Sequence, residues 1–159
     1  MSHGKLRSAH DQALSLLTAR AYSVGNLRRK LVLKQYPADE VSSVIERLMK
    51  SGLLDDERFA EQFVRGRLPG KGASRVRLKQ QLFQRGISAE IAETAIDQVM
   101  NDEPVDTQSM VIRAARKKLT SMSNLEPVVQ RRRLYAYLGR AGYKPDEIRL
   151  AMLAAFEPE

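Results

Sequence analysis

The most constraining feature of this chain is one leucine spacing that occurs three times. Each copy has two leucines four residues apart and a turn after four more residues, and the copies begin at Leu27, Leu78 and Leu134. A second apolar period, also at four-residue intervals, follows each copy. A period of roughly 50 residues is typical of one small supersecondary unit that is repeated and stacked. We therefore expect an elongated array, a shape suited to lying along a partner, instead of one globular core.

Each unit reads as three helices. Apolar residues recur three or four positions apart, and the alternating runs and hairpin turns of strands are missing. We therefore predict an all-α fold of three tandem three-helix repeats. The predicted helices are 8–21, 23–34, 37–50, 56–68, 74–85, 88–100, 107–119, 127–140 and 145–156. The predicted domains are an N-terminal arm at 1–7, repeats at 8–54, 55–101 and 107–156, a linker at 102–106 and a tail at 157–159.

Several residues predict where these helices begin and end. Ser23 and Ser88 precede apolar periods and are expected to cap a first turn with their hydroxyl groups. Pro37 suits a first helical position, where its missing N–H costs nothing. Glycines that take the left-handed conformation without a Cβ clash are expected to stop three helices. They are Gly52, Gly86 and Gly142.

The composition excludes several classes of protein. The chain has no cysteine, so it has no disulfide framework and no thiolate metal site. No apolar run approaches the roughly 18 residues that a membrane span needs, and the start lacks the apolar segment of a signal peptide. We expect a soluble cytoplasmic protein. Its formal charge of +8, from 27 basic and 19 acidic residues, favours an anionic partner such as a nucleic acid or a complex containing one.

The charge follows the repeats in bands. Residues 58–85 contain eight bases and one acid, whereas residues 88–106 contain six acids and no base. The first and second helices of each unit are thus basic, and the third helices are mostly acidic. One interpretation is a set of basic strips that face a partner. The other is that neighbouring bands pair with each other, although exposed ion pairs contribute only about 0–1 kcal/mol each.

Three basic clusters are the candidate partner-binding and nucleic-acid-binding sites. They are Arg65, Arg67, Lys71, Arg75, Arg77 and Lys79; Arg113, Arg116 and Lys117; and Arg132 and Arg133. On a helical wheel Arg75 and Lys79 fall within the apolar arc, so an alternative is that their stems pack on a neighbouring helix and their charged heads reach water. Arg77 and Lys71 are better candidates for contact with a partner.

Two further clusters have fold-based explanations. The three consecutive arginines at 131–133 span about 200° of a helix, so at least one of them is expected to serve the fold. The acidic residues at 55–57 lie at a predicted helix start, where the helix dipole favours negative charge. His3 and His10 have no partner at metal-ligand spacing, and nucleotide-binding and hydrolase motifs are missing. We expect no catalytic residue, no metal and no cofactor.

Four segments, taken together and in order, resemble the RecX family, the bacterial regulators of the RecA recombinase. They are Arg20-x-Tyr22-Ser23-x3-Leu27-x2-Lys30-Leu31, Gly52-Leu53-Leu54-Asp55-Asp56-Glu57-Arg58-Phe59-Ala60, Gly86-Ile87-Ser88 and Leu138-x3-Gly142-Tyr143. The resemblance spans about 14–156. Asn26 departs from the Glu usual in the family, and Gln35 stands where the other two units have glycine. Both departures concern helix ends and local stability.

The resemblance implies both a shape and a function. RecX proteins are elongated, curved, all-helical arrays that lie in the groove of the RecA filament on single-stranded DNA. They inhibit its ATPase, strand-exchange and co-protease activities, and so affect DNA repair and the SOS response. The family implies a monomeric protein that is not an enzyme and needs no cofactor. We add weak direct binding to single-stranded or duplex DNA as an expectation, and the resemblance assigns no contact residue by residue.

Two other functions compete with this expectation. The second and third helices of each unit imitate a helix-turn-helix pair, so the chain could read duplex DNA. Against this, the third helices are acidic and make poor recognition helices. A nuclease is the remaining alternative, and DNA turnover abolished by chelation would support it.

Overall fold

The computed structural model describes residues 7–68, 74–102 and 106–157, and all regular structure in these ranges is helical. The all-α prediction is confirmed. The helices are α1 (Ala9–Ala19), α2 (Val24–Leu33), α3 (Ala38–Lys50), α4 (Asp56–Arg65), α6 (Arg75–Phe83), α7 (Ala89–Asp102), α8 (Thr107–Thr120), α9 (Pro127–Arg140) and α10 (Pro145–Phe156).

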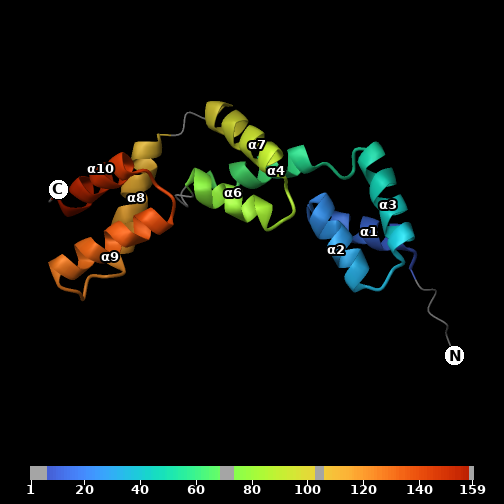
Figure 1. Ribbon diagram of the computed structural model, residues 1–159, viewed down its shortest axis with the longest axis horizontal. Coiled ribbons are helices and arrows are strands. Elements are labelled where there is room, and N and C mark those ends of the chain that lie inside the picture. The colour runs from blue at the N-terminus through green and yellow to red at the C-terminus, as the bar shows by residue number, and fades with distance from the viewer. Residues whose placement is uncertain (1–6, 69–73, 103–105, 158–159) are drawn as a thin grey trace.

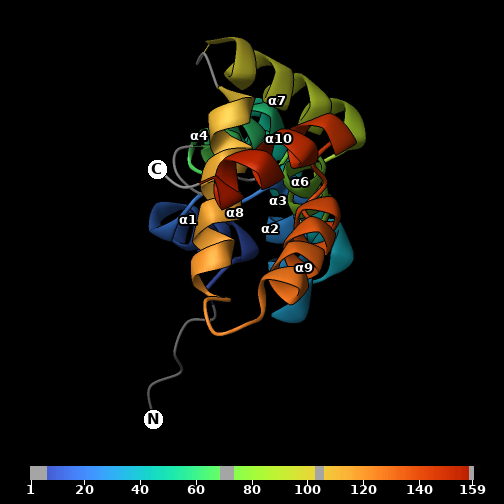
Figure 2. The ribbon, with the colours of Figure 1, turned by 90° about the vertical axis from the view of Figure 1, so that its left-hand side faces the viewer.

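The helices form three groups in a row. Figure 1 shows α1 to α3, then α4, α6 and α7, then α8 to α10, following one another along the longest axis of the molecule. The first and last helices lie at opposite ends of the row. Figure 2 looks along this row, so the three groups overlap in that view. The prediction of three tandem three-helix repeats in an elongated, curved array is confirmed.

Each group has its own hydrophobic cluster. The paired leucines of the repeated spacing, such as Leu27 and Leu31 in the first group, are fully buried in all three clusters. The spacing therefore marks the side of each second helix that packs on its neighbours. Met110 is an exception to the division, because it belongs to α8 but packs into the cluster of the second group. This methionine ties the third group to the second.

Most helix ends follow the sequence signals. Ser23 accepts a hydrogen bond from the N–H of Asn26, and Ser88 accepts one from Ile91, as predicted for caps. Pro37 was predicted at the first helical position, but it lies one residue before the helix and serves as the N-cap of α3. Helix α7 continues through Asp102, beyond its predicted end and into the predicted linker. Residues 103–105 of that linker lie outside the described residues, and Asp106 caps α8.

The left-handed helix stops are also where predicted. Gly52, Gly86 and Gly142 have φ angles of 72°, 79° and 89°. Gln35 follows the second helix of the first unit, as Gly86 and Gly142 follow the second helices of the other two, and it has a φ of 65° although it carries a Cβ. The same backbone turn thus ends the second helix in all three units.

Two junctions of the same kind join the three units. The hydroxyl of Ser23, the cap of α2, donates to the carbonyl of Arg85 at the end of α6. The hydroxyl of Ser74, the cap of α6, donates in the same way to the carbonyl of Ala141 at the end of α9. The start of each second helix therefore faces the end of the next one, so α2, α6 and α9 follow head to tail along the lower edge of Figure 1. Opposite ends of two helix dipoles meet at each junction, which is favourable.

Backbones approach closely at both junctions. A Cβ on Gly25 would lie 3.1 Å from the Cα of Gly86, and a Cβ on Gly142 would lie 2.6 Å from the Cβ of Val76. At the first junction the Oδ1 of Asp56 also accepts the N–H of Val24 at 2.8 Å. Burial raises the pKa of the Asp56 carboxyl, and this hydrogen bond opposes the rise only in part. The junctions thus combine helix capping with tight backbone packing.

Candidate functional site

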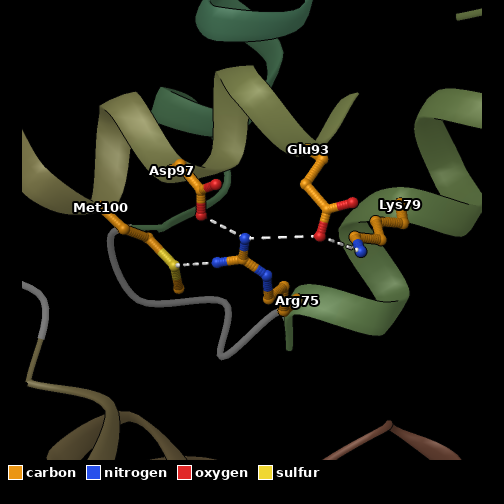
Figure 3. Close-up of polar contacts among 5 residues, drawn as sticks. All are labelled: Arg75, Lys79, Glu93, Asp97 and Met100. Atoms are coloured by element: carbon orange, nitrogen blue, oxygen red, sulfur yellow. Dashed lines mark hydrogen bonds and ion pairs between the residues drawn. The ribbon is translucent and has the colours of Figure 1, made fainter. Parts of the chain in front are cut away.

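Cations of the second unit are held by the acidic helix beside them (Figure 3). Arg75 of α6 pairs with Asp97 of α7, and its Nη2 lies 3.8 Å from the Oε1 of Glu93. The Nζ of Lys79 lies 2.7 Å from the same Glu93 oxygen, and the Nη1 of Arg75 also contacts the sulfur of Met100. The basic band of α6 and the acidic band of α7 therefore pair with each other, as one interpretation of the sequence proposed.

Two more cations of this cluster have partners inside the protein. The Nη2 of Arg65 lies 3.3 Å from Asp102, at the end of α7, and 3.9 Å from Glu61. The guanidinium of Arg67 lies 4.1 Å from the ring centroid of Phe63. The guanidinium of Arg85 lies 4.5 Å from that same ring, and burial followed by the charge of Arg67 lowers its pKa. These residues attach the end of α4 to the rest of the second unit.

Arg77 differs from its neighbours. It is exposed, and among the described residues it forms no hydrogen bond or ion pair through its side chain. It nevertheless lies near the third unit, because its charge acts on Tyr143. Burial raises the pKa of Tyr143 to about 12, Tyr137 and Glu147 add to the rise, and Arg77 opposes it. Within the described part of the chain, Arg77 is therefore a free cation beside the second junction. Lys71, its predicted companion, lies outside the described residues.

The cations of the α8 cluster differ in their contacts: one bonds to another helix, and the other two are exposed. Arg116 donates to the carbonyl of Ala154 on α10 at 3.4 Å, so it helps to hold the two helices together. Arg113 and Lys117 are both exposed. Their spacing relative to Arg116 places the three residues on one side of α8, as predicted.

The arginines of α9 are also divided. Arg131 lies over the ring of Phe156 at 4.3 Å, which confirms that at least one of the three serves the fold. Arg132 and Arg133 line a groove between α9 and the end of α8, together with Lys118 and Arg140. The sequence interpretation did not assign the last two to a site. The missed signal is the spacing of Arg133, Tyr137 and Arg140, which places them on one face of α9.

This groove has a volume of about 810 Å³. Four cations line it, and no carboxylate does. The Nζ of Lys118 lies 5.2 Å from the ring centroid of Tyr137, which fixes the ammonium group within the groove. The arrangement suits an anionic group on the ligand.

Two other kinds of site are missing from the described ranges. Within 7–68, 74–102 and 106–157, no three side chains of the metal-binding types lie close enough together to hold an ion. None of the helices in these ranges is long and apolar enough to cross a bilayer.

Comparison with known proteins decides the family. Residues 9–48 match the family model described as the first three-helix domain of RecX, and residues 55–96 match the model of the second. The chain is 36% identical to the regulatory protein RecX of Trichlorobacter lovleyi over 86% of its length and 88% of that protein. It is 34% identical to RecX of Pelodictyon phaeoclathratiforme over 96% of its length and 91% of that protein. The chain belongs to the RecX family.

Solved RecX structures share this fold. The crystal structure of RecX from Lactobacillus salivarius superposes with a TM-score of 0.75 and 20% identity, over 92% of this chain and 94% of that one. A second crystal structure of regulatory protein RecX gives a TM-score of 0.77 and 19% identity, over 90% of this chain and 70% of that one. At these identities the likeness establishes the fold alone. The family models and the RecX relatives confirm the resemblance read from the sequence.

Proposed function

We propose that this RecX protein binds RecA and its filament on single-stranded DNA and mainly inhibits it. The affected activities are ATP hydrolysis, strand exchange and the co-protease step of the SOS response. The observation that carries the proposal is the match to proteins named as RecX regulators over nearly the whole chain. In this proposal the protein works in the cytoplasm as a monomer, catalyses no reaction and needs no cofactor.

The distribution of charge supports the proposal and refines it. Arg65, Arg75 and Lys79 neutralise carboxylates of their own unit, so we assign them to holding the second unit together. The exposed cations of the candidate clusters that pair with no carboxylate in the described ranges remain for the filament, and they are Arg77, Arg113, Lys117, Arg132 and Arg133. They lie along two successive units. Such a row fits a nucleoprotein polymer that presents anionic groups repeatedly, and contacts of this kind favour fast, salt-dependent association.

The direct test is the ATPase activity of RecA on single-stranded DNA, titrated with this protein at a low and a high salt concentration. We expect inhibition that saturates with the added protein and weakens at the higher salt concentration, because exposed charges are screened. An unchanged ATPase rate at saturating protein, with no association by sedimentation, would overturn the proposal.

A pair of charge-reversal variants tests the second unit. Lys71→Glu with Arg77→Glu should weaken inhibition about tenfold or more, because two attractive contacts become repulsive. Helicity measured by circular dichroism should not change, since the side chain of Arg77 is exposed and forms no hydrogen bond or ion pair in the described ranges. Arg47→Glu with Lys50→Glu is the matched control, because it changes the net charge equally on the exposed side of acidic α3. Equal inhibition by both variants would remove the second unit from the interface.

The duplex-reading alternative gains no support from the helix faces. Helix α7, which would be the recognition helix of the second unit, carries Glu93 and Asp97 against the basic residues of α6. Its acidic side chains would repel phosphates. Tight, sequence-dependent binding to naked duplex DNA would reverse this conclusion.

A further inference from the structure

The groove between α8 and α9 gathers positive charge without opposing charge. Lys118 comes from α8, whereas Arg132, Arg133 and Arg140 come from α9. The groove between α4 and α7, by contrast, is lined by three glutamates. The two grooves lie between different helix pairs, the first and second helices of the third unit and the first and third helices of the second unit, so the protein offers one basic and one acidic depression.

The surrounding sequence does not neutralise these cations. Residues 113–140 contain eight bases and a single acid, Glu126, which does not line the groove. In the part of the chain that the structure describes, none of the ion pairs involves the four groove cations. Their charge is therefore available to a ligand, and the concave surface concentrates it.

We propose that this groove binds the phosphodiester backbone of single-stranded nucleic acid without reading its sequence. Guanidinium groups match phosphate oxygens in geometry and bind them bidentately. An acidic protein surface is the competing ligand. Interfaces between proteins are depleted of charge at their centres, whereas those with nucleic acids are much more positive. A groove with four cations and no carboxylate fits the second kind.

The shape of the site selects a single strand. Duplex DNA is read by a protruding element, such as a helix, that enters its grooves. The cations here instead line a depression of about 810 Å³, which is within the roughly 300–1,000 Å³ range of ligand pockets. A depression of this size admits a short stretch of one strand, as the basic grooves of single-strand-binding proteins do. Phosphate contacts carry no sequence information, so binding is sequence-independent.

A contact between Lys118 and Tyr137 positions one of the groove cations. The ammonium of Lys118 rests on the ring of Tyr137, which is itself partly buried against the core of the third unit. Arg133 and Arg140 lie on the same side of α9 as this ring. The strand would therefore run along one face of α9, with Lys118 approaching from the opposite wall.

The test uses the full-length protein and a fluorescein-labelled oligothymidine of about 16 nucleotides. Binding is followed by fluorescence anisotropy between about 50 and about 200 mM salt. Arg133→Glu with Arg140→Glu should lower the affinity at least about tenfold. It should also reduce the slope of log affinity against log salt by about 1.4, because each lost phosphate contact removes about 0.7. Both side chains are exposed, so the helical circular dichroism spectrum should be unchanged.

The matched control is Arg29→Glu with Lys30→Glu on α2, the corresponding helix of the first unit. These residues are exposed, and the substitutions change the net charge by the same amount. The control should lower affinity by no more than about threefold, the general effect of a smaller net charge. Equal losses in both variants would overturn the proposal, because they would show diffuse attraction without a site.

Two competitors identify the ligand class. A duplex of the same length that binds the groove as tightly as the single strand would refute the preference for one strand. A polyglutamate peptide that binds more tightly than the oligonucleotide, and loses affinity in the groove variant, would assign the site to an acidic protein. None of these measurements contains RecA. Failure here therefore leaves the proposed regulation of RecA standing, and failure of the RecA assay leaves this site untouched.

Discussion

Gln35 shows how position in the array decides which residue a turn accepts. The second helix of each unit ends in a left-handed turn, but only Gly86 and Gly142 meet a neighbouring unit. Each of these two lies at a junction where a Cβ would approach the next helix to about 3 Å or less. Gln35 ends α2, and in the described ranges no capping serine of another unit donates to the turn that it forms. No close approach of a second backbone is required there, so a residue with a side chain is tolerated at the cost of local strain.

Replacing Gln35 should relieve this strain. Gln35→Gly is expected to stabilise the protein by about 1 kcal/mol, because glycine adopts a positive φ without the Cβ clash. Urea unfolding followed by circular dichroism measures the change. Gln35→Ala is the control, since it shortens the side chain but keeps the Cβ, and it should stay within about 0.5 kcal/mol of the parent protein. Equal stability of the two variants would show that the backbone at this position is not strained.

Asp56 gives the first junction a distinctive dependence on pH. Burial raises its pKa above the ordinary value of 3.8, so the folded protein takes up this proton before the unfolded chain does. A raised carboxyl pKa means that ionised Asp56 opposes folding. Its unfavourable contribution is full above the folded pKa, and it disappears as the pH falls through the interval between that pKa and 3.8.

Asp56→Asn should therefore stabilise the protein near neutral pH. The asparagine oxygen still accepts the N–H of Val24, and the desolvated charge is gone. The advantage should shrink between about pH 7 and about pH 4, measured as the difference in urea midpoints. Glu57→Gln, which removes an exposed charge from the same helical turn, should instead destabilise slightly by weakening the interaction with the helix dipole. A loss of stability in both variants would contradict the assignment.

At the scale of the elements, the junctions between second helices define the array. Each uses the hydroxyl of a capping serine and the carbonyl before a left-handed glycine of the next unit. Glycine is required at the second junction for two separable reasons. One is its positive φ, and the other is the position of Val76, which would lie only 2.6 Å from a Cβ at Gly142. Gly52 has the first requirement without the second, because nothing lies within 4 Å of the place that its Cβ would occupy.

The pair of variants Gly142→Ala and Gly52→Ala separates these two costs. Gly52→Ala should destabilise by about 1–2 kcal/mol, the cost of a left-handed alanine. Gly142→Ala should cost a further 1–3 kcal/mol or so, because the added methyl group overpacks the junction. Unfolding in urea gives both values. If the two variants are equally destabilised, the close approach at Gly142 does not contribute to stability.

The sequence predicts these elements well because their signals are local. Leucine spacing, capping serines and left-handed glycines each act within one or two turns, so the extents of the second helices were predicted to within two residues. The second role of Ser23 was not predictable in this way. Its partner, Arg85, is 62 residues away, and no local pattern links the two. Met110 was missed for the same reason, since its core belongs to another unit.

Predictions about the basic clusters were limited in the same way, because contacts between distant segments leave no local pattern in the sequence. The helical wheel placed Arg75 and Lys79 on the side that faces the neighbouring helix, which is correct. It did not show that Glu93 and Asp97 lie there, because the register between two helices is set by packing. Two of the four cations that line the groove were candidate binding residues in the sequence. Arg132 and Arg133 stand out as a run, whereas Lys118 joins them only when α8 folds against α9.

At the scale of the whole molecule, the charged residues have two roles: some hold helices of one unit together, and others are available to a partner. Charges in the second unit mostly pair across its own helices, whereas the groove cations of the third unit remain unpaired within the described residues. The units are joined at helix ends by hydrogen bonds and close backbone packing and not by ion pairs between bands. The shape of the array should therefore stay the same as the salt concentration changes, whereas binding to an anionic partner should weaken at high salt.

Small-angle scattering tests this distinction. A compact protein of 159 residues would have a radius of gyration of about 15 Å. Because its units form a row, this protein should give a clearly larger value and an asymmetric distribution of interatomic distances. The value should stay the same between low and high salt, since the junctions do not depend on screened charges. Gly142→Ala should change the distance distribution while helicity is retained, because only the second junction is altered. A parent value near 15 Å, or one that rises as salt is added, would mean that the units fold back on one another through their charged bands.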